Sequence, residues 1–322
     1  MIISIGLIAI GFILLIKGAD FLVDGASNIA KKFHIPEIII GLTIISIGTS
    51  MPELFVSITS AIDGFPDMAI GNVIGSNIAN LFLILGVSAV IKSIPFKRET
   101  RLIEIPLCFI ISVIFFAICL TGQDVSRSDS AILMGVFIAF IIYTIVMAKK
   151  GEEFDKEEND ESIQKNKENN SAKSTLKDII AIVLGIVALK FGGDLAVDNA
   201  VKVATILGLS EKIISVTILA IGTSLPELVT SVSAAAKGKS DIAIGNVLGS
   251  NIFNMLLIIG VSAVIKPIIY NINYNKDLII LLAGTLVLAL FPLIPPKNKM
   301  SRMNGIVYVL MYAGYMVSLF FV

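Results

Sequence analysis

The amino-acid sequence predicts an all-α membrane protein, with ten transmembrane helices arranged as two inverted five-helix repeats. Three observations lead to this prediction. Of the 322 residues, 56% are hydrophobic and none is Trp, which is too apolar for a soluble domain of this length. Apolar runs long enough to cross a bilayer, about 20 residues as a helix, recur from end to end of the chain. A set of motifs also occurs twice, at one fixed offset.

The apolar runs predict the positions of the spans. They are 2–27, 36–62, 67–91, 102–120, 130–148, 178–200, 211–236, 241–265, 277–294 and 303–322. A membrane β-barrel would need short segments of alternating polarity, whereas stretches such as 103–120 are apolar on all sides, so helices are favoured. The N-terminus has no basic region and no small-residue cleavage pattern, so we expect the first span to be retained.

The internal repeat aligns four blocks at an offset of 174 residues, without gaps. The blocks are Gly-Thr-Ser-x-Pro-Glu-Leu at 48–54 and 222–228, Ala-Ile-Gly-Asn-Val-x-Gly-Ser-Asn-Ile at 69–78 and 243–252, Gly-Val-Ser-Ala-Val-Ile-Lys at 86–92 and 260–266, and the pair Asp20 and Asp24 with Asp194 and Asp198. One offset shared by separate blocks indicates a duplicated unit of about five helices. An odd number of spans makes the second copy point the opposite way across the membrane.

The distribution of basic residues predicts the orientation. With the N-terminus outside, the inner loops hold 18 of the 25 Lys and Arg residues. These loops are 31–34, 92–101, 149–177, 237–240 and 295–302. The loop 63–67 has no basic residue, while its counterpart carries Lys237 and Lys239, so equivalent loops are expected to face opposite sides. Both termini are therefore predicted outside the plasma membrane.

The chain is expected to divide into three parts. Residues 1–148 form the first five-helix repeat, and 178–322 form the second, inverted one. Residues 149–177 between them are rich in Glu, Lys, Asn, Asp and Ser, which predicts a disordered cytoplasmic linker. The balance of 25 basic and 25 acidic residues gives no indication of a nucleic-acid partner, and no obligatory protein partner is evident.

The Gly-Thr-Ser-x-Pro-Glu motif carries the predicted chemistry. Its proline lies in mid-span, where it should break the helix and free carbonyl oxygens within 46–50 and 220–224. Glu53 and Glu227 follow in apolar sequence, where an ionised carboxylate is costly unless a cation offsets it. The adjacent hydroxyls complete a set of hard oxygen donors, which Ca²⁺ and Na⁺ prefer; transition metals favour nitrogen or sulfur. A structural ion pair of the glutamates with Lys17 or Lys190 is the alternative.

The second block adds further polar groups. Its glycines at four-residue spacing allow close helix packing, and packing alone can explain them. Ser76 and Asn80 share one helix face. Asn72 and Asn246 fit either a packing role or a ligand role, and the four aspartates near span ends are favoured as packing or interfacial residues rather than ligands.

At these motifs the sequence strongly resembles the cation/calcium exchanger superfamily, specifically the prokaryotic sodium/calcium exchangers, over nearly the whole chain. The resemblance implies ten helices, with the first and sixth sliding against a ligand-binding core. It also implies an ion-coordinating set, carried over position by position. The set consists of Thr49, Ser50, Glu53, Ser76, Asn80, Thr223, Ser224, Glu227, Ser250 and Asn254, with backbone oxygens of Ser46 and Ala220. Some sodium/calcium exchangers carry Asp at the position of Asn254; here both copies have Asn.

The predicted function is secondary active antiport of Ca²⁺ for Na⁺ by alternating access at a midplane carboxylate site. A Ca²⁺/H⁺ antiporter using the same site is the alternative, and a passive cation channel is a third. An enzyme is not expected, because a membrane hydrolase would need a base beside Ser50 or Ser224, and neither motif contains His or Lys. No cofactor is expected, since Ca²⁺ and Na⁺ are transported ions. Two cysteines in one span and a single His also argue against other metal sites.

Overall fold

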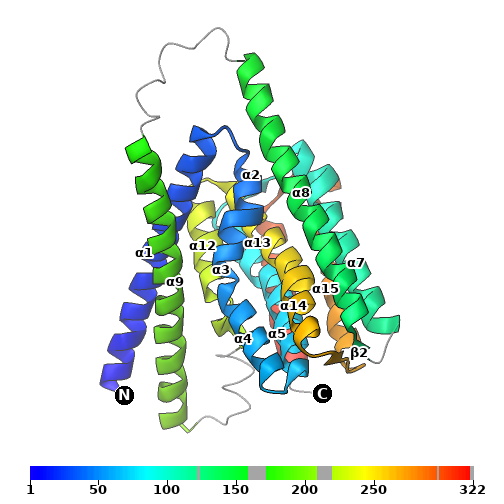
Figure 1. Ribbon diagram of the computed structural model, residues 1–322. Helices are drawn as coiled ribbons and strands as arrows, with labels where there is room; N and C mark the ends of the chain where they lie inside the picture. The colour runs from blue at the N-terminus through cyan, green and yellow to red at the C-terminus, as the bar shows by residue number, and fades with distance from the viewer. Residues whose placement is uncertain (122–123, 159–171, 209–219, 296, 320–322) are drawn as a thin grey trace.

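The computed structural model describes residues 1–121, 124–158, 172–208, 220–295 and 297–319. Figure 1 shows a bundle of long helices, with α1 (Ile2–Lys32) and α9 (Ala172–Ile206) crossing side by side along one flank. The N-terminus lies at the end of the bundle opposite the C-terminal end of α8 (Arg127–Glu158). The chain is thus mainly helical, as its composition predicts.

The remaining elements follow the order of the repeat. In the first half these are α2 (Glu37–Ile40), η1 (Gly41–Ile45), α3 (Ser46–Thr49), α4 (Met51–Ile62), α5 (Pro66–Ile78), η2 (Ala79–Ile84), α6 (Leu85–Ile91), β1 (Ile94–Pro95), η3 (Thr100–Glu104), α7 (Ile105–Thr121) and β2 (Asp124–Val125). In the second half they are α11 (Ala220–Gly222), α12 (Leu225–Ala236), α13 (Ser240–Phe253), η5 (Asn254–Ile258), α14 (Ile259–Ile265), β3 (Ile268–Ile269), α15 (Tyr274–Leu290), η6 (Phe291–Leu293), β4 (Lys299–Met300) and α16 (Arg302–Ser318). The two-residue strands are a small departure from the all-α prediction.

Among the described residues, fewer than the ten predicted spans are present as helices long and apolar enough to cross a membrane. Within the described ranges, seven helices are long and apolar enough to cross a membrane, or eight when the bent pair Glu37–Thr49 and Met51–Ile62 is one span. The predicted spans 211–236 and 303–322 both run into residues outside the described part of the chain. The count of ten therefore stays a prediction.

Helix extends into the segment that the sequence assigns to a linker. α8 continues to Glu158 and α9 begins at Ala172, so both ends of 149–177 are helical, and residues 159–171 lie outside the described part. Lys and Glu lose little rotamer freedom in a helix, so this polar composition does not by itself prevent helix formation. The polar sequence marks where the apolar spans end, and the helices do not end there.

α13 is the central helix of the core, because all of its residues are buried. Two short antiparallel sheets join the two copies of the repeat. β1 pairs with β4, with Ile94 opposite Met300, and β2 pairs with β3, with Asp124 opposite Ile269. At the offset of 174 residues β1 corresponds to β3. Each copy therefore supplies one strand to each sheet, as a two-fold arrangement of the copies requires.

Glycines bring α1 and α9 into close contact. A Cβ added at Gly18 would lie 2.9 Å from the Gly185 carbonyl oxygen, and one at Gly185 would lie 2.7 Å from the Leu22 amide nitrogen. The same holds at Gly11, where an added Cβ would lie 2.8 Å from the Gly192 carbonyl oxygen. Small residues that let backbones approach are the usual basis of helix association in membranes. α1 and α9 therefore form one tightly packed pair.

Replacing Gly185 with Leu is expected to break this pair. The added side chain would collide with the α1 backbone, and overpacking that forces the backbone to shift costs about 1–3 kcal/mol. Thermal unfolding of the purified protein in detergent should show a lower Tm. Gly6→Leu is the matched control on α1, since no described atom beyond its chain neighbours and the adjacent backbone of α1 lies within 4 Å of the added Cβ. Equal Tm values for the two variants would show that the α1–α9 contact is loose.

Candidate cation site

Each repeated Gly-Thr-Ser-x-Pro-Glu motif lies at a break between helices, as its proline predicts. In the first copy, segments Glu37–Thr49 and Met51–Ile62 differ in direction by 49°. In the second copy, Ser224 precedes α12, which has its proline in the first turn. Ser50 (φ −84°, ψ 8°) and Ser224 (φ −89°, ψ 6°) have nearly the same backbone conformation. The predicted helix breaks are therefore present in both copies.

The main-chain oxygen of Ser46 is engaged within the helix. It accepts a hydrogen bond from the Ser50 main-chain amide at 3.0 Å, and the Thr49 hydroxyl lies 3.3 Å away. A carbonyl oxygen has two lone pairs, so the Ser50 amide uses one, and the second faces the Thr49 hydroxyl, whose single proton has Asn246 Oδ1 as a second acceptor at 3.2 Å. The Ser46 oxygen keeps its helical hydrogen bond because the helix breaks one turn later, after Thr49. The counterpart, Ala220, is the first residue of α11.

The two glutamates meet across the interface between the copies. Glu53 and Glu227 are 0% and 1% exposed. The Ser50 hydroxyl donates to Glu227 Oε1 at 2.8 Å, and the Ser224 hydroxyl donates to Glu53 Oε1 at 3.4 Å. Each glutamate is therefore held by the serine of the other copy. In the sequence the two glutamates are 174 residues apart, and folding brings them to one site.

No basic side chain neutralises this pair among the residues that the structure describes. Lys190 forms an ion pair with Asp194 one turn along α9, and not with either glutamate. Glu53 Oε2 and Glu227 Oε2 are buried and have no hydrogen-bond partner. The structural ion pair considered from the sequence is therefore not formed by Lys190.

Two asparagines support the segments that carry the glutamates. The Asn72 side-chain amide donates to Ser57 Oγ at 3.1 Å, and the Asn246 side-chain amide donates to Ser231 Oγ at 2.9 Å. Asn246 Oδ1 lies 3.2 Å from the Thr49 hydroxyl and competes with the Ser46 main-chain oxygen for its single proton. These contacts connect α5 to α4 and α13 to α12, so both asparagines have the packing role that the sequence allows.

Thr223, the counterpart of Thr49, is partly buried in the turn before α12.

The second block places its polar groups where α5 and α13 change into π-helix. Asn80 lies in η2, and Asn254 begins η5. Single π-helical turns within α-helices are frequent at functional sites. Ser76 and Ser250 lie one turn earlier and are buried, and Ser250 Oγ has no partner.

Five buried side-chain atoms without a hydrogen-bond partner belong to predicted site residues. They are Glu53 Oε2, Asn80 Oδ1, Glu227 Oε2, Ser250 Oγ and Asn254 Oδ1. All five are oxygens, and a buried polar atom left unpaired costs about 1–3 kcal/mol. In the described ranges, no cluster of three or more His, Cys, Asp or Glu side chains could hold a metal ion, so a cation here would also need amide and hydroxyl oxygens. This donor set fits Ca²⁺ or Na⁺.

The comparison with known families decides the class of the protein. The model of the sodium/calcium exchanger protein family matches residues 3–146 and 177–321. The chain belongs to this family. An exchanger of this family is a transporter, and it moves cations including Ca²⁺ across a membrane.

Several relatives match the exchanger over nearly its whole length. A putative antiporter, CaxA, of Alkalimonas amylolytica is 35% identical, and the match covers 99% of each chain. The sodium/calcium exchanger MaX1 of Methanosarcina acetivorans is 32% identical, with 98% of each chain covered. A solved structure of the sodium-calcium exchanger NCX_Mj superposes with a TM-score of 0.83 at 31% identity, over 99% of each chain. The fold of this exchanger is therefore that of known sodium/calcium exchangers.

Sequence reasoning missed Asn77 and Asn251. Both lie in the repeated second block, between the predicted ligands, and both are buried. Their side chains cross from one copy to the other, as described below. The available signal was the second Asn of the Gly-Asn-x-x-Gly-Ser-Asn motif, which glycine spacing does not explain.

Proposed function

We propose that this exchanger is a secondary active antiporter that moves Ca²⁺ in exchange for Na⁺ at a site between Glu53 and Glu227. The observation that carries the proposal is the buried carboxylate pair, with one open oxygen on each glutamate and no basic partner within the described residues. Ca²⁺ would neutralise two ionised carboxylates. The family and the relatives named sodium/calcium exchanger support Na⁺ as the second ion.

The proposed ligands are the twelve residues expected from the sequence. Ten would use side-chain oxygens, and Ser46 and Ala220 would use main-chain oxygens. Support comes from the burial of Glu53, Glu227, Asn80, Asn254 and Ser250 with unpartnered oxygens. A cation would take the second lone pair of the Ser46 oxygen, and the Thr49 hydroxyl would then donate its proton to Asn246 Oδ1 instead.

Coupling follows from charge. An empty pair of ionised carboxylates resists crossing an apolar barrier, so the site changes sides only when cations occupy it. Three Na⁺ in place of one Ca²⁺ would leave a net charge of +1 and make the exchange electrogenic. The alternative, a Ca²⁺/H⁺ antiporter, would protonate the same glutamates.

We propose the ten-helix arrangement of two inverted repeats, 1–148 and 178–322, connected by the cytoplasmic segment 149–177. Two observations support a two-fold relation of the copies. Each of the sheets β1–β4 and β2–β3 takes one strand from each copy, and the serine of each copy donates a hydrogen bond to the glutamate of the other. The basic inner loops support termini outside the plasma membrane.

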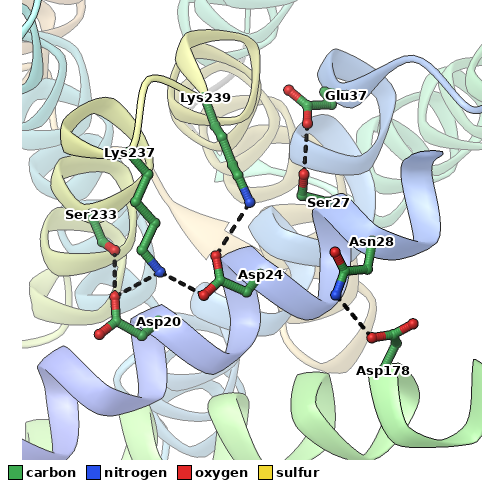
Figure 2. A network of polar contacts seen from close by, with 9 residues as sticks. All are labelled: Asp20, Asp24, Ser27, Asn28, Glu37, Asp178, Ser233, Lys237 and Lys239. Carbon is green, nitrogen blue, oxygen red and sulfur yellow. Dashed lines mark hydrogen bonds and ion pairs between the residues drawn. The ribbon is translucent and has the colours of Figure 1, made fainter. Parts of the chain in front are cut away.

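Polar contacts hold α1 to the end of α12 (Figure 2). Lys237 Nζ lies 2.8 Å from Asp20 Oδ1 and 2.9 Å from Asp24 Oδ2, and Lys239 Nζ lies 3.2 Å from Asp24 Oδ1. Ser233 Oγ also donates to Asp20 Oδ1 at 3.0 Å. Burial alone would lower the pKa of Lys237, but hydrogen bonds with the two aspartates raise it above its ordinary value, so the lysine is cationic.

The counterpart of this contact in the other copy cannot form. At the same offset, Asp194 and Asp198 replace the α1 aspartates, but Asp63 and Phe65 stand where the lysines would be. The contact is therefore one-sided. In alternating access, with α1 and α9 moving together against the core, it would stabilise the conformation closed on the side of Lys237, which is the cytoplasmic side in the proposed orientation.

Radioactive calcium uptake into proteoliposomes tests the proposal. Vesicles loaded with Na⁺ and diluted into Na⁺-free buffer should accumulate Ca²⁺ at a fixed pH. Matched vesicles without a Na⁺ gradient but with an imposed pH gradient should not. Uptake driven only by the pH gradient would move the protein to Ca²⁺/H⁺ antiport, and uptake that requires neither gradient would indicate a channel.

A further inference from the structure

Four buried asparagines form a hydrogen-bonded arrangement where α5 meets α13. The Asn77 side-chain amide (Nδ2) donates to the main-chain oxygen of Asn251 at 3.3 Å. The Asn251 side-chain amide (Nδ2) donates to the main-chain oxygen of Asn77 at 3.2 Å. A main-chain oxygen can only accept a hydrogen bond. The NH₂ group of each of these side chains must therefore point at the opposite backbone, which fixes the orientation of both amides.

The fixed side-chain amides of Asn77 and Asn251 determine the orientation of the side chains of Asn254 and Asn80. With its NH₂ group committed, Asn77 presents Oδ1, which accepts from Asn254 Nδ2 at 3.0 Å. Asn251 Oδ1 likewise accepts from Asn80 Nδ2 at 3.1 Å. An Asn80 or Asn254 side chain rotated by half a turn would place two acceptor oxygens against each other. Asn254 has a second acceptor, Ser76 Oγ, at 3.0 Å, whereas no second acceptor for Asn80 is found among the described residues.

The consequence is that Asn80 and Asn254 retain unpartnered oxygens. Oδ1 of each is buried and accepts no hydrogen bond. The reverse orientation would leave an NH₂ group there, which repels a cation. The orientation is transmitted between the copies, because Asn77 acts on Asn254 and Asn251 acts on Asn80.

We propose that Asn77 and Asn251 are positioning residues that keep the carbonyl oxygens of Asn254 and Asn80 available to the transported cation. This inference rests on the proposed function, since it takes the unpartnered oxygens as cation ligands. Neither positioning residue touches the ion. Each sets which atom of its neighbour does so.

Asn251→Ala and Asn77→Ala test the proposal in purified exchanger. Asn251→Ala removes the acceptor of Asn80, so the apparent KM for Ca²⁺ should rise about tenfold, the worth of one oriented hydrogen bond to a buried group, with little change in maximal rate. Asn77→Ala should raise it less, because Ser76 still holds Asn254. A purely structural role would lower the amount of active exchanger and its maximal rate, and would leave KM unchanged.

A double-mutant cycle gives the decisive comparison. In Asn80→Asp either carboxylate oxygen can face the cation, so orientation no longer matters, and adding Asn251→Ala should then raise KM no further. The same tenfold rise in both backgrounds would overturn the proposal.

The Ca²⁺ concentration that half-maximally raises Tm provides a second readout, independent of transport. Wild-type protein stabilised by Ca²⁺ but inactive in Na⁺-driven uptake would refute the proposed function alone. An unchanged half-stabilising concentration in Asn251→Ala would refute the positioning role alone. If Asn251→Ala does not fold, Asn77→Ala is measured in its place, with Asn254→Asp as the paired background.

Discussion

Glu53→Gln and Glu227→Gln are each expected to reduce Na⁺-driven Ca²⁺ uptake by at least about a hundredfold, because a lost charge partner in a buried site costs about 3 kcal/mol or more. Each substitution removes one of two charges that would balance Ca²⁺, and leaves the cation with a single carboxylate in an apolar region. The serine contact to Oε1 has an equivalent in the Gln carbonyl, so the fold is preserved while the charge is lost. Uptake by matched amounts of reconstituted protein measures the effect.

Glu104→Gln is the matched control for this prediction. Glu104 is also 1% exposed, and its Oε2 also has no partner, but it lies in η3 and accepts a hydrogen bond from Tyr143. It is not a proposed ligand, so uptake should remain close to the wild-type rate. A comparable loss in Glu104→Gln would mean that any buried glutamate is required, and full activity in either site variant would refute the site.

The helix breaks and the oxygen donors could be predicted from the sequence because both depend on local chemistry. A mid-span proline interrupts a helix wherever it occurs, and a carboxylate in apolar sequence requires compensation. The repeat further indicated that the two motifs are equivalent. That Ser50 would hold Glu227, rather than the glutamate of its own motif, depends on how the copies dock and is visible only in the structure.

Other features could not be predicted because they arise from contacts between distant segments. The orientation of Asn80 depends on an amide 171 residues away along the chain. The sequence favours the aspartates of α1 as packing or interfacial residues, but it does not reveal their pairing with Lys237 and Lys239, because this contact joins the start of one copy to a loop of the other. The extent of α8 could not be predicted for a different reason, since a change from apolar to polar residues marks the end of a membrane span but not the end of a helix.

Linking α1 covalently to α12 is expected to stop transport reversibly. In Figure 2 the side chains of Asp20 and Ser233 lie in direct contact, with Ser233 Oγ 3.0 Å from Asp20 Oδ1. A disulfide in Asp20→Cys/Ser233→Cys would fix α1 against the core and hold the site open to one side only. Oxidised protein should show Ca²⁺ uptake near zero, and reduction should restore it. Cys108 and Cys119, both free and buried, are first replaced with Ala.

A second disulfide distinguishes inhibition caused by fixing α1 to α12 from a general effect of cross-linking. Asn28 Nδ2 donates to Asp178 Oδ1 at 3.1 Å, also drawn in Figure 2, and this contact joins α1 to α9 within the closely packed pair. If α1 and α9 move as one unit, Asn28→Cys/Asp178→Cys should cross-link and continue to transport when oxidised. Inhibition by this second cross-link would mean that α1 moves relative to α9. Formation of the Asp20→Cys/Ser233→Cys disulfide is verified on a non-reducing gel. Undiminished transport by this cross-linked protein would exclude movement of α1 against the core, and with it the proposed mechanism of alternating access.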